Sequence, residues 1–244
     1  MYWSDYIWFL AAIRVCLGFS LYASAKVRSA FAQYSGARCR SGMTGYDTAV
    51  RLLQANHVTG ITVGCVKGSL SDHYNPSKGV VNLSDSTYGQ SSVASVAVAA
   101  HELGHVMQKE QGYLPYRIRT ALVPVVNFGS FLAMPLVLVG LLTDLFIRAT
   151  GPDVGFWIAM VGVILYGGTF LFALVTLPVE LDASRRAGQM LISEGILSED
   201  ELPGAKKVLS AAAMTYLASM LTSLVYFLRF LVYVLTLFGK RDRR

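Results

Sequence analysis

A chain of 244 residues that is 54% hydrophobic and only 15% charged is far more apolar than soluble domains, in which about 25% of residues are charged. This balance excludes an ordinary water-soluble protein and predicts that lipid covers part of the surface. The net charge of +6 does not indicate nucleic-acid binding, because the basic residues lie beside the apolar stretches, as they do in membrane proteins. Three cysteines without metal-type spacing argue against a disulfide framework.

Four apolar stretches are each long enough to cross a bilayer as a helix, which takes about 20 residues. They cover residues 6–25, 121–147, 154–177 and 208–238. The first contains Arg14 and lacks the basic start and the small-residue cleavage site of a signal peptide, so we interpret it as a retained anchor. Together the stretches predict a multi-pass α-helical protein of the cell (inner or plasma) membrane.

The distribution of Lys and Arg predicts how the spans are oriented, because these residues are enriched in cytoplasmic loops. Residues 26–120 contain ten of them, whereas the loop 148–153 contains one. We therefore expect residues 26–120 and 178–207 to face the cytoplasm. If the fourth stretch crosses the membrane once, the basic tail 240–244 lies outside, against this rule. A single crossing and a stretch that bends back on itself therefore both stay open.

The polar segment 26–120 has a mixed α/β pattern. The predicted elements are a helix over 44–56 with Thr44 as N-cap, a strand over 61–66, two strands over 72–75 and 80–83, and a helix from the cap residue Ser91 to about Gln111. A Pro-Ser-Lys-Gly turn separates the second and third strands, which predicts a β-hairpin. This small α/β unit contains the main chemical motif of the chain.

The motif is His101-Glu102-Leu103-Gly104-His105, which lies on the predicted helix that follows the hairpin. Residues i and i+4 share one face of a helix, so His101 and His105 can both bind one Zn²⁺. Glu102 lies at the edge of that face, where it can take a proton from a metal-activated water without binding the metal itself. Gly104 leaves room beside the metal.

A catalytic zinc needs a third protein ligand and one open position. Glu180, at the end of the third apolar stretch, is the best candidate, with Asp182 as the competing carboxylate on another face of the same helix. That helix is expected to start at Pro178 and to run to Gly195. The remaining histidines, His57 and His73, are the other options.

Several stretches together resemble the small membrane-bound neutral zinc metallopeptidases of bacteria. They are residues 71–76, 98–105, 121–127 and 177–187. More remotely, the chain is similar to heat-shock membrane proteases and CaaX prenyl proteases. The resemblance implies one Zn²⁺ held by His101, His105 and Glu180, with Glu102 as the base. Ser184 stands where the remote relatives carry an Asp that orients a ligand, so Ser184, Asp182 or a backbone carbonyl could have that role.

The resemblance also implies a role for the hairpin, because in such enzymes an edge strand beside the metal helix pairs with an extended substrate. Here that strand would be 80–83 or 72–75. His73 and Tyr74 are then candidate catalytic residues, and either of them, or Arg185, could stabilise the oxyanion.

The interpretation is a multi-pass α-helical membrane protein with a small cytoplasmic α/β metallopeptidase unit. Its expected parts are a transmembrane anchor (1–25), the catalytic unit (26–120), a transmembrane hairpin (121–177), the third-ligand helix (178–207), and a C-terminal helix or span with a basic tail (208–244).

The expected function is a zinc metalloendopeptidase that hydrolyses peptide or protein substrates. The alternative is a membrane scaffold or chaperone-like protein with a structural or vestigial zinc site; an intramembrane protease is disfavoured by the polar surroundings of His101. The sequence leaves the oligomeric state and the natural substrate open.

Overall fold

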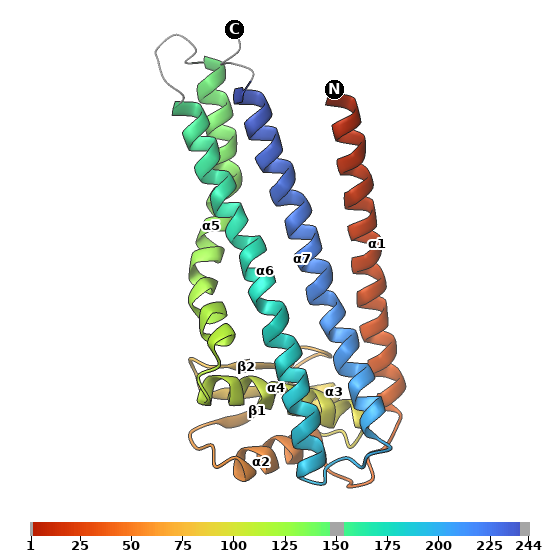
Figure 1. The fold of residues 1–244 in the computed structure, drawn as a ribbon. Coiled ribbons are helices and arrows are strands. Elements are labelled where there is room, and N and C mark those ends of the chain that lie inside the picture. The colour runs from red at the N-terminus through yellow and green to blue at the C-terminus, as the bar shows by residue number, and fades with distance from the viewer. Residues whose placement is uncertain (1, 147–153, 240–244) are drawn as a thin grey trace. The chain divides into compact units, whose positions relative to one another are not determined.

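The computed structural model describes residues 2–146 and 154–239, which form seven helices and three strands (Figure 1). In chain order they are α1 (Tyr2–Ser35), α2 (Gly45–Ala55), β1 (Thr62–Val66), β2 (His73–Asn75), β3 (Val80–Ser84), α3 (Asp85–Tyr88), α4 (Val93–Glu110), α5 (Leu114–Phe146), α6 (Val154–Ser193) and α7 (Leu202–Gly239). The chain is therefore mostly helical, with one small sheet.

Four helices are long and apolar enough to cross a membrane, as the composition predicted. These candidate spans are Tyr6–Ser35, Leu114–Thr143, Val154–Ser193 and Leu202–Thr236. The basic tail lies outside the described residues, but α7 is one continuous helix to Gly239. The fourth apolar stretch therefore does not bend back within residues 202–239.

One compact unit contains the described parts of residues 1–20, 118–176 and 217–244. Its core is formed by small and branched side chains of α5, α6 and α7, among them Val137, Ala159 and Val234. Large apolar side chains cover its outside: Trp8 and Phe131, for example, are 75% and 76% exposed. An apolar surface of this extent is unfavourable in water and fits the hydrocarbon of a bilayer.

The second unit contains residues 21–117 and 177–216. Its sheet has the order β1-β3-β2, with β1 parallel and β2 antiparallel to β3. The register pairs His73 with Asn82 and Tyr74 with Val81, which confirms the predicted hairpin. The core of this unit is built around α4, with side chains such as Leu52, Leu83 and Leu103 fully buried.

Capping boxes define where α2 and α4 begin. Thr44 accepts a hydrogen bond from the Asp47 amide and the Asp47 side chain accepts one from the Thr44 amide, so the predicted N-cap of α2 is confirmed. In α4 the cap is Ser92, which forms the same reciprocal pair with Ser95. The prediction of Ser91 is thus wrong by one residue, because only Ser92 has a hydroxyl partner at the third helical position.

The helix expected to begin at Pro178 is instead the last part of α6, which runs without interruption from Val154 to Ser193. A proline inside a helix removes one hydrogen bond, but proline is tolerated in membrane-spanning helices. The apolar stretch and the polar segment after it are therefore one helix, and the prediction of a new helix start at Pro178 is wrong.

Candidate metal centre

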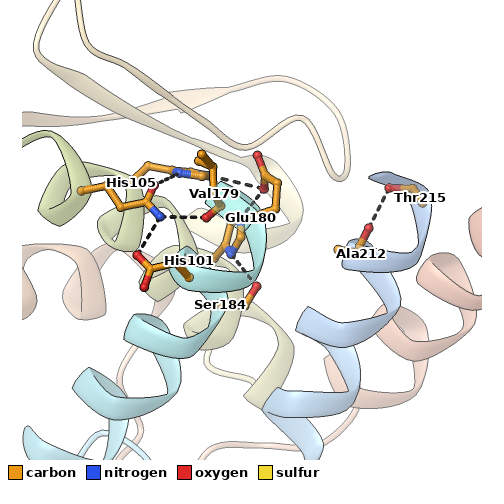
Figure 2. A network of polar contacts seen from close by, with 9 residues as sticks. His101, His105, Val179, Glu180, Ser184, Ala212 and Thr215 are labelled. Atoms are coloured by element: carbon orange, nitrogen blue, oxygen red, sulfur yellow. Dashed lines mark hydrogen bonds and ion pairs between the residues drawn. The ribbon is translucent and has the colours of Figure 1, made fainter. Parts of the chain in front are cut away.

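His101 and His105 lie on successive turns of α4, and Glu180 lies on α6. One carboxylate oxygen, Glu180 Oε2, is 3.2 Å from His101 Nε2 and 3.5 Å from His105 Nε2. All three side chains are sequestered, with 14%, 10% and 2% of their surfaces exposed for His101, His105 and Glu180. Figure 2 shows the two imidazoles beside the Glu180 carboxylate.

This cluster can hold a metal ion, because one ligand atom from each residue lies within 4.8 Å of the other two. It is the one such group of His, Cys, Asp or Glu within residues 2–146 and 154–239. Two imidazole nitrogens and one carboxylate oxygen are a donor set that suits Zn²⁺, and three protein ligands leave the fourth position open. The residues therefore fit a catalytic type of zinc site.

Gly104 allows the two helices to bring these candidate ligands together. A Cβ atom at this position would lie 2.5 Å from the backbone oxygen of Ala183, so only glycine permits this approach of α4 to α6. Gly104 is next to His105 in sequence, and Ala183 is one turn from Glu180. The expectation that Gly104 leaves room beside the metal is wrong, because Ala183 occupies that space.

The orientation of His105 is determined by Gln108, one turn further along α4. The Gln108 amide nitrogen donates to the Val179 carbonyl at 2.7 Å and to Asp182 Oδ2 at 3.0 Å, so its oxygen must face His105 Nδ1, which is 3.0 Å away. That oxygen can only accept, so Nδ1 carries the proton. Nε2 is then left with the lone pair that a metal requires.

His101 is oriented by a different group. Its Nδ1 lies 3.2 Å from the Ser184 hydroxyl, so Nε2 is the nitrogen that faces Glu180 (Figure 2). Of the three partners that the sequence left open, Ser184 therefore contacts His101 directly. Asp182 acts on the other histidine, through Gln108.

Asp182 is held by two cations as well as by Gln108. Arg185 and Arg186 both donate to its carboxylate, Arg186 at 2.5 Å. Asp182 lies outside the group of three ligand atoms, which agrees with the expectation that only one of the two carboxylates of α6 faces the histidines.

The charge environment of His105 favours its protonated form when no metal is present. Burial by itself lowers the pKa of this imidazole, but the hydrogen bond and the negative charge of Glu180 outweigh that effect, and Glu102 adds to it. The net result is a pKa above the ordinary value of 6.5. The site thus attracts a cation, and a proton and a metal ion compete for the same nitrogen.

The other residues predicted for the site lie outside the cluster of three candidate ligands. His73 is an exposed residue of β2, and its ring nitrogens contact the Ser71 carbonyl and the Asn82 amide at 2.9 and 3.1 Å. Tyr74 packs against the core of the second unit, and its buried hydroxyl has no hydrogen-bond partner among the described residues. His57 follows α2 and takes a left-handed backbone conformation with φ of 54°.

Sequence reasoning missed two residues beside the histidines. Gln108 carried a usable signal, since it is a polar residue one turn after His105, on the same face of the helix as the two histidines. Tyr116, which is 6% exposed, places its ring 6.3 Å from that of His105. Its position in the first turn of α5 gave no sequence signal, because nothing local relates it to α4.

Comparison with known proteins supports the same chemistry. A family model described as "Putative neutral zinc metallopeptidase" matches residues 8–235. "Putative membrane protease YugP" of Bacillus subtilis (strain 168) is 40% identical over 224 residues, which are 92% of this chain and 95% of that protein. No solved structure matches the chain. The resemblance drawn from the motifs is confirmed, and the chain belongs to the family of putative neutral zinc metallopeptidases.

Proposed function

We propose that this protein is a membrane-anchored zinc metalloendopeptidase with one Zn²⁺ held by His101, His105 and Glu180. The observation that carries the proposal is the convergence of two Nε2 atoms and one carboxylate oxygen, with both Nδ1 atoms engaged elsewhere. Two oriented imidazoles and one carboxylate form a site whose donor atoms are already gathered for a metal ion.

Glu102 gives the site its proposed reactivity. Bound zinc would polarise the peptide carbonyl and acidify a water molecule. The buried Glu102 carboxylate, 7% exposed, accepts the proton of the attacking water and returns it to the departing amine. Glu102 follows His101 directly on α4, and its negative charge contributes to the raised pKa of His105.

The strand β2 is the proposed binding site for an extended substrate. It is an edge strand, since within the described sheet it pairs only with β3, and it packs against α4. Its free edge can add one more strand through backbone hydrogen bonds. We keep Tyr74 and His73 as candidates for oxyanion stabilisation. Tyr74 is the stronger, since its hydroxyl has hydrogen-bonding capacity to spare, whereas both nitrogens of His73 have partners.

The test of the reaction is the full-length Glu102→Gln variant, assayed for bound zinc and for cleavage of an unfolded protein such as casein. We expect one zinc ion per chain, as in the wild type, with hydrolysis abolished. Glu110→Gln, at the exposed end of the same helix, is the matched control and should retain activity. Undiminished cleavage by Glu102→Gln would rule out this role for Glu102.

The scaffold alternative makes a different prediction in the same experiment. A protein with a structural zinc would bind the metal and cleave nothing, in the wild type and in both variants. Structural sites usually have four protein ligands, whereas three candidates lie together in the described chain, which favours the catalytic role.

We further propose that the unit containing the metal centre faces the cytoplasm, since residues 26–120 contain ten Lys and Arg. Cys65 is a natural reporter, because it is exposed in this unit whereas Cys16 and Cys39 are buried. A membrane-impermeant maleimide should label Cys65 in permeabilised cells only. Cys65→Ser is the control for specificity, and labelling of Cys65 in intact cells would reverse the orientation.

A further inference from the structure

A groove of about 810 Å³ lies between the C-terminal half of α6 and the N-terminal half of α7. Its walls include Leu181, Ile192, Leu202 and Leu209, and all its lining residues belong to the second unit. Ligand sites are typically of this size and mainly apolar, with a few polar groups that orient the ligand.

Gly188 lines this groove, and no close helix contact requires a glycine there as one does at Gly104. A glycine inside a helix is less stable than alanine by about 1 kcal/mol. At Gly104 the close backbone of Ala183 requires it, but a Cβ at Gly188 would meet only Leu202 Cδ1, at 3.7 Å. The missing side chain at Gly188 therefore serves to keep the groove open rather than to let two helices approach.

The groove is separate from the place where a substrate would meet the metal. Its lining includes Ser184, whose hydroxyl contacts Nδ1 of His101, whereas Nε2 of the same ring faces Glu180. An occupant of the groove therefore lies behind the imidazole, on the side away from the metal position.

The charges at the groove indicate what kind of molecule it binds. Two cations, Arg185 and Lys206, line it together with one anion, Glu199, and all three are exposed. Apolar walls with a net positive charge complement an amphiphile that has a hydrocarbon chain and an anionic head. Both helices continue from the groove into the apolar residues of the first unit and are candidate membrane spans, so phospholipid is the amphiphile at hand.

We propose that this groove binds one acyl chain of an anionic membrane phospholipid, with the lipid phosphate beside Lys206 and Arg185. Lys206 is the cation to test, since Arg185 already donates to Asp182. The proposal does not depend on peptidase activity, and its experiment measures lipid attachment only.

The full-length protein is reconstituted in phosphatidylcholine nanodiscs that contain a trace of phosphatidylglycerol with a photoreactive diazirine on one acyl chain. After illumination and proteolysis, mass spectrometry locates the attached lipid. We expect attachment within residues 181–213, displaced by unlabelled phosphatidylglycerol but not by phosphatidylcholine.

Two variants test the groove and the charge separately. Gly188→Leu should reduce attachment by about ten-fold, because each excluded methylene is worth about four-fold in lipid binding. Gly168→Leu on the same helix is the matched control, since a Cβ there meets nothing within 4 Å, and it should leave attachment unchanged. Lys206→Gln should weaken binding by about five-fold for phosphatidylglycerol alone, the effect of one basic side chain near an anionic lipid.

The proposal would be overturned by lipid attachment spread evenly along the helices. It would also be overturned if Gly188→Leu attached as much lipid as the wild type. Equal competition by phosphatidylcholine would overturn it as well. Displacement of the label by an uncharged apolar peptide, with no effect of Lys206→Gln, would assign the groove to peptide instead. If Gly188→Leu does not fold, the exposed Lys206→Gln substitution still decides the result.

Discussion

The close approach of α4 and α6 at Gly104 can be tested by adding a single methyl group. In Gly104→Ala the new Cβ would lie 2.5 Å from the Ala183 carbonyl oxygen and 3.0 Å from two further backbone atoms, whereas ordinary contacts begin at 3.4 Å. Backbone atoms cannot rotate away as the end of a side chain can. The two helices must therefore move apart, and the distances from Glu180 to the histidines increase with them.

The sign of the stability change follows from two opposing magnitudes. Replacing glycine by alanine inside a helix stabilises it by about 1 kcal/mol, whereas overpacking a core costs about 1–3 kcal/mol. Because the clash at Gly104 is with backbone, we take the upper end of the cost and expect a net loss of about 2 kcal/mol. For a chain of this length, that loss lowers Tm by about 4–8 °C.

The assay is thermal unfolding of the full-length, metal-free protein in detergent, together with zinc affinity from competition with a chromogenic chelator. Gly188→Ala is the matched control, because its Cβ makes an ordinary contact at 3.7 Å, so it should be neutral or slightly stabilising. A Tm for Gly104→Ala as high as that of the control, with wild-type zinc affinity, would refute the reasoning.

The further predictions concern the candidate ligands and their partners. Gln108→Leu should weaken zinc binding by about 10–100-fold, because His105 loses the group that selects its tautomer. Ser184→Ala should weaken zinc binding less, since a serine hydroxyl is a weaker orienting partner than an amide held by a carboxylate. Glu180→Gln should weaken binding by more than either, as measured by the same chelator competition, and an unchanged affinity would exclude Glu180 as a ligand. Zinc affinity should fall as the pH drops through the raised pKa of His105. The metal-free protein should lose stability as the pH rises through that pKa, because protonated His105 stabilises the fold only below it.

The histidine pair could be predicted from sequence because its geometry is local. Four residues on a helix place His101 and His105 on one face whatever the rest of the chain does. Glu180 lies 75 positions beyond His105, so local geometry could not select it; its place at the end of an apolar stretch and the resemblance of residues 177–187 did. Its contact depends on Gly104, whose role became visible only when Ala183 was placed against it.

The boundaries of α1 and α6 were not predictable from hydropathy, because each helix continues from an apolar stretch into a polar one. Apolar character in the first stretch ends near Ala25, but α1 continues to Ser35, and its residue Phe31 is buried against Ala94 and Val208. Packing partners supplied by distant parts of the chain thus extend helices beyond the point where their own composition changes.

Position 184 is a serine, whereas the remote resemblance drawn from the motifs implies an aspartate there. The groups that orient the two histidines account for this difference. At this position a hydroxyl, rather than a carboxylate, contacts His101. The carboxylate of Asp182, two residues earlier on α6, points instead to Gln108 and through it orients His105. Gln108 also contacts the carbonyl of Val179, the residue before Glu180, so one amide links a candidate ligand on α4 to the backbone that positions the candidate ligand on α6. The negative charge that the motif lacks at residue 184 is therefore present in the site, but it acts on the other histidine.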